Sequence, residues 1–156
     1  MRGEAEKYAK KVAPHLLEDE TVLVAAQVQY KGGAKQLAGM AGGLVGYAIA
    51  AKLTGRPDTP TGSIAEQVPT TPHTLWVQTD QRTLFFQTGN LRFGPPLSII
   101  ENGYVASVVG FKAKVRYGKL RFAFVDGSSI ELDLLFDREV PRINDAATSV
   151  FGAPSA

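Results

Sequence analysis

The chain has 156 residues, of which 44% are hydrophobic and 21% charged, and its formal net charge is +2. This balance argues against wholesale disorder, and the length fits one domain spanning residues 1–156. The absence of cysteine excludes a disulfide scaffold, thiolate metal sites and a cysteine nucleophile. Because the net charge is small and no recognition motif is present, we expect no nucleic-acid partner.

The first 31 residues predict a short helix followed by a strand. A helix is expected over Glu4–Leu17, since Tyr8, Val12 and Leu16 repeat every fourth residue, and Pro14 should kink it or start a second short turn. Thr21–Lys31 alternates as a half-buried strand does. The alternate residues that share its apolar face are Val22, Val24, Ala26, Val28 and Tyr30.

Residues 32–72 are an insertion of unusual composition. Eight of the 16 glycines lie between Gly32 and Gly62. The second half, rich in Pro and Thr, has too little apolar material for a core element, so a loop is expected. In the first half, small residues recur every fourth position, and a helix would place them on one stripe that lets a second backbone approach closely. They are Ala34, Ala38, Gly42, Gly46 and Ala50.

The same insertion holds the single membrane candidate of the sequence. Leu37–Ala51 is uncharged for 15 residues, against the roughly 20 that span a bilayer. The N-terminal residues mix Glu and Lys and lack the apolar core of a secretory signal. We therefore expect a cytoplasmic protein, with peripheral contact at the inner face of the membrane left open.

The remaining chain predicts antiparallel strands and a last helix. A hairpin is expected from His73–Thr79 and Thr83–Thr88, and weaker strands from Leu97–Glu101 and Tyr104–Val109. Strong strand candidates follow at Phe111–Tyr117, Leu120–Val125 and Ser129–Phe136. A helix from about Arg138 to Phe151 has Pro141 in its first turn and an apolar stripe of Val140, Ile143, Ala147 and Val150.

The apolar pattern of the last two hairpins predicts their registers. The first needs a two-residue loop, Gly118-Lys119, and the second a three-residue loop, Asp126-Gly127-Ser128. In this arrangement Lys112, Lys114 and Arg116 share the outer face, Arg116 lies opposite Arg121, and Asp133 lies beside Arg121. Antiparallel strands without crossover helices favour a curled sheet or barrel with a helix over one end.

Three segments together resemble the bacterial pleckstrin-homology-like (PH-like) domains, a family related in shape to PH and GRAM domains. They are LLEDETVLVAAQVQY, LWVQTDQRTLFF and KLRFAFVDGSSIELDL before a final amphipathic helix. The second segment looks like the family's T-D-x-R-L hairpin, with Thr79, Asp80 and Arg82 in place and Thr83 where an apolar residue is more usual. The third looks like its L-x-F-x-x-x-D-G hairpin.

The resemblance implies a mostly β (α+β) fold: a seven-stranded antiparallel PH-like barrel with a C-terminal capping helix and a short N-terminal helix. Residues 32–72 would then join the first two strands. In PH domains this region binds inositol phosphates through basic residues. Lys31 could serve as one of them, but His73-Thr74-Leu75-Trp76 supplies no basic pair, so phosphoinositide binding is not implied. The family hosts lipid, peptide and self-association roles, so the fold alone does not settle function.

No residue pattern in the chain indicates an enzyme. The usual nucleophile, zinc and nucleotide motifs are absent, and His15 and His73 are isolated, which makes a poor metal site. Glu131 and Asp133 are expected on the solvent face of a strand. We therefore expect no enzymatic activity, no metal and no cofactor.

Basic residues concentrate in two places. Lys112, Lys114, Arg116 and Arg121 form either a solvated, partly paired sheet face or a site for an anion or acidic surface. Lys31, Lys35, Lys52 and Arg56 flank the apolar run of the insertion, where no acid occurs from residue 31 to 56, and a basic apolar segment suits an anionic lipid surface. The insertion could instead pack on its own sheet or a sister chain, or have no partner.

The leading hypothesis is a non-enzymatic binding or assembly module that contacts an anionic membrane or a protein partner through the 32–56 segment and the basic sheet face. The alternative is a homo-oligomeric scaffold whose segment 34–50 packs against a sister chain, without lipid binding.

Overall fold

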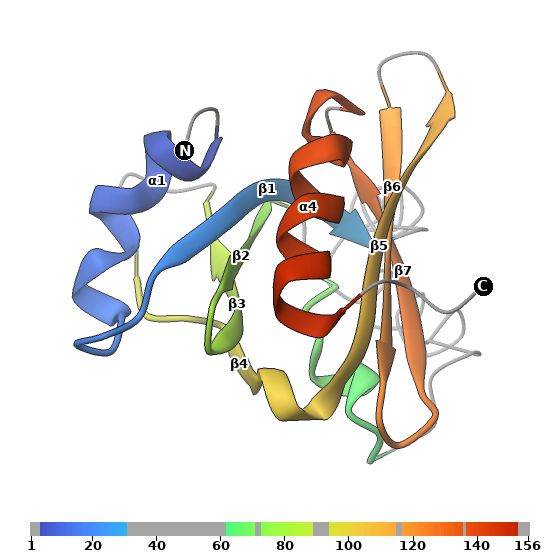
Figure 1. Ribbon diagram of the computed structural model, residues 1–156, viewed down its shortest axis with the longest axis horizontal. Coiled ribbons are helices and arrows are strands. Elements are labelled where there is room, and N and C mark those ends of the chain that lie inside the picture. The colour runs from blue at the N-terminus through green and yellow to red at the C-terminus, as the bar shows by residue number, and fades with distance from the viewer. Residues whose placement is uncertain are drawn as a thin grey trace, which may run out of the picture.

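The computed structural model describes residues 4–30, 62–70, 73–88, 94–114, 117–135 and 137–152 (Figure 1). These residues form a mostly β structure with a helix near each end of the chain. In chain order the elements, with η for a 3-10 turn, are α1 (Glu4–Val12), η1 (Ala13–His15), β1 (Val22–Tyr30), η2 (Ala65–Gln67), β2 (Thr74–Thr79), β3 (Arg82–Gln87), β4 (Ser98–Glu101), η3 (Asn102–Tyr104), β5 (Val105–Lys114), β6 (Tyr117–Phe124), β7 (Ser129–Leu134), η4 (Asp137–Glu139) and α4 (Val140–Phe151).

The seven strands form one antiparallel sheet in the order β4-β3-β2-β1-β7-β6-β5. The antiparallel sheet and both helices confirm the prediction. The closed barrel is not confirmed: among the described residues β4 and β5 are the two edge strands and do not pair with each other, so the sheet is open. β4 has only four residues and is followed directly by η3, which connects it to β5 at the opposite edge of the sheet. β1 is the central strand and belongs to both halves (Figure 1).

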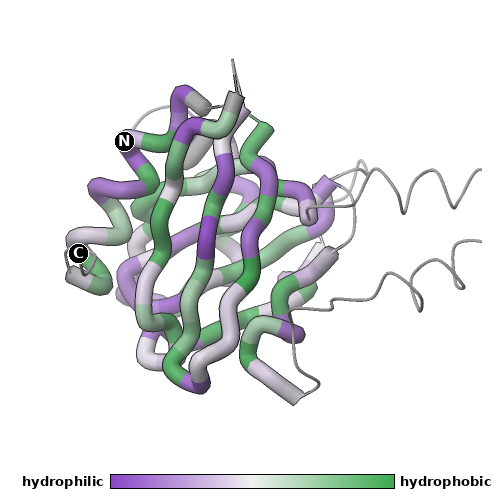
Figure 2. Tube along the Cα trace, turned by 90° about the vertical axis from the view of Figure 1, so that its right-hand side faces the viewer, coloured by the Kyte–Doolittle hydropathy of each residue, from purple (hydrophilic) through white to green (hydrophobic). Residues whose placement is uncertain are grey.

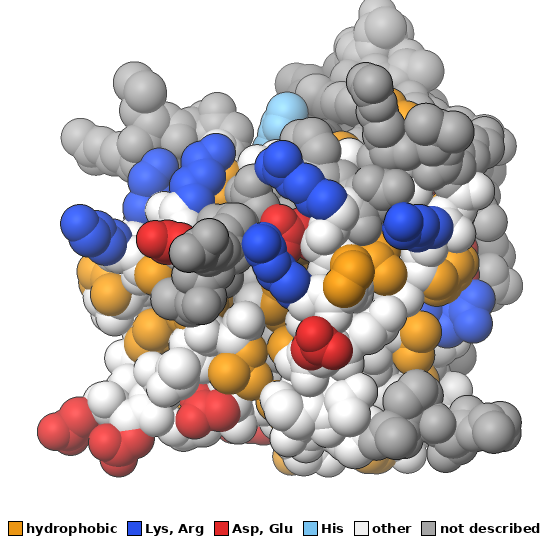
Figure 3. All heavy atoms as spheres, turned by 45° about the horizontal axis from the view of Figure 1, so that its top comes forward, with side chains coloured by type: hydrophobic (Ala, Val, Ile, Leu, Met, Phe, Trp, Pro, Cys, Tyr) orange, Lys and Arg blue, Asp and Glu red, His pale blue; other side chains and the backbone are white. Residues whose placement is uncertain are grey.

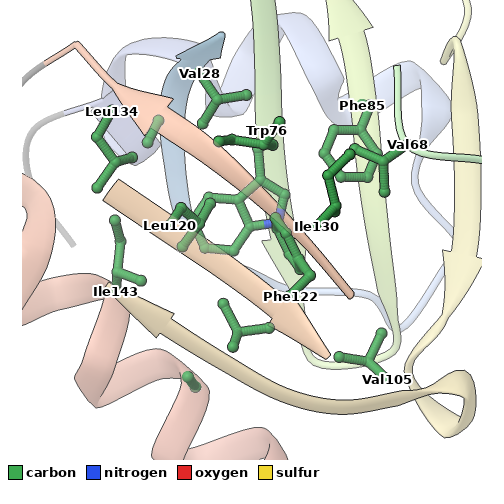
Figure 4. Packing of buried hydrophobic residues seen from close by; sticks show 14 of the residues in the cluster. Val28, Val68, Trp76, Phe85, Val105, Leu120, Phe122, Ile130, Leu134 and Ile143 are labelled. Atoms are coloured by element: carbon green, nitrogen blue, oxygen red, sulfur yellow. The ribbon is translucent and has the colours of Figure 1, made fainter. Parts of the chain in front are cut away.

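The sheet curls so that its two halves face each other across the main core. Trp76 of β2 and Phe122 of β6 meet at 5.5 Å between ring centroids with an interplanar angle of 83°, and Phe85 of β3 lies 5.8 Å from the same Phe122 ring. Figure 4 shows these rings between strands of both halves, with Ile143 of α4 beside Leu120. The three rings are fully buried, so the contact between halves is an aromatic core.

A second, smaller core lies between α1 and the outer face of β1–β3. Tyr8 and Val12 of α1 are buried against Leu75, Leu84 and Phe86, and a further leucine of the loop after η1, Leu16, packs beside them. The tube in Figure 2 shows apolar and polar residues alternating along strands of the sheet, as a strand requires where one face is buried. β2 and β3 lie between two cores, so these strands are buried on both faces.

α4 covers the free edge of β5 through one close contact. The side-chain amide of Asn144 donates to the Gly110 carbonyl at 2.9 Å and its oxygen accepts the Gly110 N–H at 2.9 Å. A Cβ on Gly110 would lie 3.2 Å from Cγ2 of Ile143, so glycine lets the helix approach. The strand candidate 104–109 and the first part of the candidate 111–117 therefore belong to one strand, β5 (Val105–Lys114), which includes Gly110. Tyr117, the last residue of the second candidate, begins β6 instead.

The predicted register of the β5–β6 hairpin is wrong. Leu120 pairs with Gly110, and Lys112 pairs with Gly118. Gly118 is therefore a buried residue inside β6 rather than part of a turn, and a Cβ there would lie 3.3 Å from Cγ2 of Val140. The sequence pattern misled because a bulge between Lys112 and Lys114 shifts the alternation along the strand.

The β6–β7 hairpin has the expected buried residues but a different turn. Phe122 pairs with Ile130 and Ala123 with Ser129, so the turn is centred on Asp126, one residue earlier than predicted. The Phe124 N–H donates to the Ser128 carbonyl at 2.9 Å and closes the turn.

Part of the Pro/Thr-rich segment belongs to the main core, although its composition predicted a loop with too little apolar material for a core element. Ala65 of η2 and Val68, which follows η2, are fully buried, and Ile64 packs beside them. The composition of the whole segment concealed this, because a few apolar residues around one short turn are enough to reach the core. Figure 4 shows one of them, Val68, beside Phe85.

Candidate functional site

The predicted anion site does not form as a single cluster on the sheet face. Arg121 lies opposite Val109 and Glu131, not opposite Arg116, and its Nη2 is 2.9 Å from Glu131 Oε2. Its guanidinium also lies over the Phe111 ring at 5.3 Å. Arg121 is therefore engaged by its neighbours, and Glu131 rather than Asp133 is its partner.

Asp133 pairs instead with Lys119. Lys119 Nζ is 2.8 Å from Asp133 Oδ1 and 3.7 Å from Glu131 Oε1. The hydrogen bond that Lys119 donates to Asp133 outweighs partial burial and raises the pKa of Lys119. The outer face of β6 and β7 is thus a ladder of paired charges.

Of the other predicted basic residues, Lys112 is exposed and has no ion pair among the residues that the structure describes. Lys114 is the last residue of β5. Arg116 lies outside the described residues, as do Lys31, Lys35, Lys52 and Arg56 of the insertion. The small-residue stripe predicted for self-association, Ala34, Ala38, Gly42, Gly46 and Ala50, also lies outside them.

α1 adds exposed cations that were not among the predicted site residues. Lys7, Lys10 and Lys11 are all exposed, and Lys7 Nζ and Lys11 Nζ lie 5.4 Å and 5.8 Å from the centroid of the Tyr8 ring. Tyr8 is anchored by the hydrogen bond from Gln27 Nε2 to its hydroxyl at 3.0 Å. The sequence could have indicated this cluster. At 3.6 residues per turn, the three lysines share a helical sector of roughly 100° beside the apolar stripe.

The start of α4 brings further cations close to Lys112. Gly118, the partner of Lys112, lies next to Val140, the first residue of α4, and the exposed Arg138 and Arg142 flank that residue. Arg142 Nη1 is 3.3 Å from Oε1 of the buried Glu139. We call the exposed cations of these elements the basic end: Lys7, Lys10, Lys11, Lys112, Arg138 and Arg142.

The basic end is visible as a band in Figure 3, where blue side chains spread across the part of the molecule that holds α1 and the start of α4. Glu6 and Asp145 are the exposed carboxylates among the described side chains of the two helices. Cations therefore outnumber acids on this surface.

Turns from both halves of the sheet are joined by hydrogen bonds into one surface. The Thr21 N–H donates to Asp80 Oδ1 at 2.9 Å, and the Asp80 N–H donates to the Thr21 carbonyl at 3.1 Å. The Asn102 N–H donates to the Gln81 carbonyl at 3.1 Å. These bonds link the loop before β1, the β2–β3 turn and η3.

The surface continues to the β6–β7 turn and η2. The Val125 N–H donates to the Tyr104 carbonyl at 3.0 Å, and the Ile64 N–H donates to Asp126 Oδ2 at 2.8 Å. Hydrogen bonds from Ser128, and then from the Ile64 N–H, lower the pKa of Asp126. The turn therefore holds η2 in place through an ionised carboxylate.

Exposed carboxylates gather on these linked turns. Within segments 16–21, 62–68, 79–82, 101–104 and 125–128, every exposed charged residue is acidic. We call this surface the acidic end; its carboxylates are Glu18, Asp19, Glu66, Asp80, Glu101 and Asp126. β5 separates the two ends, since Tyr104 and Lys112 are eight residues apart along the chain, or roughly 26 Å.

A buried ion pair underlies the acidic end. Arg82 Nη2 and Nε lie 2.5 Å and 2.8 Å from the two oxygens of Glu20, and Thr79 Oγ1 donates to Glu20 Oε2 at 2.6 Å. Burial alone would raise the pKa of Glu20, but the hydrogen bonds from Arg82, Thr79 and the Leu17 N–H together lower it. Both oxygens of the carboxylate accept hydrogen bonds that hold the loop before β1 against the β2–β3 hairpin, so the role of Glu20 is structural.

Thr83, unusual at its position in the resembled hairpin, has a buried partner. Its hydroxyl donates to Gln78 Oε1 at 2.8 Å, and Gln78 Nε2 donates to Asn102 Oδ1 at 2.8 Å. Each polar group thus gains a bond within the core, which offsets the cost of burying it.

Two further features of the described residues concern a metal ion and a hollow beside β5. No group of three His, Asp or Glu residues in the described part could hold a metal ion. A hollow of about 230 Å³ between β5 and the end of α4 is lined by Ser107, Val109, Thr148 and Phe151, among others, and no charged residue lines it. It therefore does not suit an anion.

Comparisons with known proteins give no assignment, since no protein-family model matches the chain and no curated protein is significantly similar to it. Among the described helices, none is long and apolar enough to cross a membrane.

Proposed function

We propose that the chain is a non-enzymatic binding module of the PH-like type, and that its basic end docks on an anionic membrane surface. The observation that carries this proposal is the separation of exposed charge, with cations at one end and carboxylates on the turns at the other. The T-D-x-R hairpin, the seven antiparallel strands and the C-terminal helix support the PH-like part.

The insertion is a second candidate for membrane contact, separate from the basic end. Val28 pairs with Leu134, which pairs with Gly118, the partner of Lys112. β1 then runs away from that row, because Tyr30 pairs with Leu132, and the acid-free sequence 31–56 with its apolar run follows. The composition of this sequence, apolar and basic, suits the boundary between lipid headgroups and acyl chains.

The charge of the basic end predicts a measurable affinity. Each Lys or Arg near an anionic leaflet contributes about 1 kcal/mol. Lys7, Lys10, Lys11 and Lys112 together would contribute about 4 kcal/mol, which is roughly a thousandfold increase in partitioning. Because exposed charges are screened over about 8 Å at physiological ionic strength, the binding should weaken strongly with salt.

Vesicle flotation at low salt tests this proposal, with phosphatidylcholine vesicles compared with vesicles that also contain phosphatidylserine. The full chain should float with the anionic vesicles only. Lys112→Gln should weaken binding about fivefold, whereas Arg121→Gln, with the same charge change at a paired site, should weaken it less. Equal flotation with both vesicles, or none with either, would contradict the proposal.

A further inference from the structure

We infer that the two ends of the molecule are also complementary to each other, and that the acidic end of one copy binds the basic end of a second copy. Six exposed carboxylates lie on the linked turns, and six exposed cations lie on α1, η4, α4 and β5. Complementary potentials steer association and fix its orientation. The partner that fits the acidic end is thus a second copy of this chain.

The contact is head to tail because the two surfaces lie on opposite ends of β5. A contact of this kind uses different patches on the two copies, so each copy keeps one surface of opposite sign available to a further copy. Such heterologous association continues into an open chain or closes into a ring. The average mass should therefore rise with concentration rather than stop at a dimer.

Exposed apolar side chains add to the charge at both ends. Tyr104 and Val125 are 55% and 59% exposed on the acidic end, and their backbones are hydrogen bonded to each other. Tyr117, at the start of β6 near the basic end, is 56% exposed. Exposed ion pairs alone contribute little in water, so burial of these side chains would supply the rest of the stabilisation.

Self-association of this kind does not require membrane docking, although both would use the basic end. Anionic vesicles and a second copy should then compete for that end. Variants of the acidic end separate the two properties, because they alter self-association and leave the basic end unchanged.

Sedimentation equilibrium of the full chain in low and high salt tests the inference. In low salt the average mass should rise above 16.7 kDa with concentration, and in high salt it should return to that value. Glu18→Lys with Asp19→Lys, and separately Lys7→Glu with Lys10→Glu, should each keep the monomer mass in low salt. An equimolar mixture of the two variants should associate again, because each retains the surface that the other has lost.

The fluorescence of the single tryptophan and the far-UV dichroism of each variant check that it is folded. A wild-type mass that stays at 16.7 kDa in low salt would overturn the inference. So would an association that neither charge reversal weakens, which would instead favour the predicted stripe at 34–50. If the chain self-associates but does not bind vesicles, only the proposal of membrane docking would be contradicted.

Discussion

The carboxylate of Glu20 and the guanidinium of Arg82 form a two-bond ion pair in the interior, with side-chain exposures of 0% and 8%. Arg82 Nη2 also donates to the His15 carbonyl at 2.9 Å, so one guanidinium holds η1, the loop before β1 and the β2–β3 hairpin together. The pair thereby fixes α1 against the sheet and positions the turns of the acidic end.

Replacing Arg82 by Met should destabilise the fold by about 3 to 5 kcal/mol, because it leaves a buried carboxylate without its partner. Arg121→Met removes an exposed ion pair and should cost less than about 1 kcal/mol. Urea unfolding followed by the fluorescence of Trp76, the single and fully buried tryptophan, measures both. Equal losses would show that the Glu20–Arg82 pair is no more important than a surface pair.

Acid should remove part of the stability through the same carboxylate. The pKa of Glu20 in the folded chain lies below its ordinary value of 4.5, so its contribution is present above pH 4.5 and is lost as the pH falls through the folded pKa. Asp126, whose pKa is also lowered, acts in the same direction.

The Glu20→Gln variant isolates the contribution of Glu20 to this pH dependence. The free energy of unfolding of wild type should fall more steeply below pH 4.5 than that of the variant. Parallel curves for the two proteins would contradict the assignment.

Gly110→Val should loosen α4 from β5, because the first carbon added already lies 3.2 Å from Ile143 Cγ2. Overpacking of this kind typically costs about 1 to 3 kcal/mol. Gly103→Ala is the control: its Cβ would meet no atom within 4 Å, so a change within about 0.5 kcal/mol is expected. Hydrogen exchange of the α4 amides should rise in the Gly110 variant only.

Val68→Ala should destabilise the main core by about 1.5 to 3 kcal/mol, since Val68 is fully buried. Gln67→Ala, at the neighbouring exposed position in η2, should leave the free energy of unfolding nearly unchanged. The comparison uses urea midpoints at constant slope. A Val68 variant as stable as the Gln67 variant would place this segment outside the cooperative core.

Periodicity predicted much of the fold. The alternation of β1 from Val24 to Val28, the hairpin around Asp80 and the stripe of α4 were predictable from their apolar patterns. Val22 was predicted on the same face as Val24, but an irregularity between the two places Val22 in the smaller core. The β5–β6 register was not, because the bulge at Lys112 shifts which residues face inward. The open edge was also not predictable, since Asn144 on a distant helix takes the place of a strand at Gly110.

The candidate site was predicted only in part. Lys112 and Arg121 were selected together as basic residues of one face, yet Glu131 engages Arg121 and not Lys112. Which charged side chains form ion pairs depends on the register of the strands, and the apolar pattern alone did not determine that register. The lysines of α1 could have been identified as a helical sector. That they lie in one band of the surface with the cations at the start of α4 is a property of the fold (Figure 3).

The basic end should face an anionic membrane, and the position of single probes tests this most directly. The chain has no cysteine, so Ala113→Cys near the basic end and Ser129→Cys beside the acidic end can each carry one environment-sensitive fluorophore. With phosphatidylserine vesicles that carry a nitroxide-labelled lipid, the probe at residue 113 should be quenched and shifted to the blue, while the probe at 129 should not change. Quenching at 129 equal to or greater than that at 113 would contradict docking through the basic end.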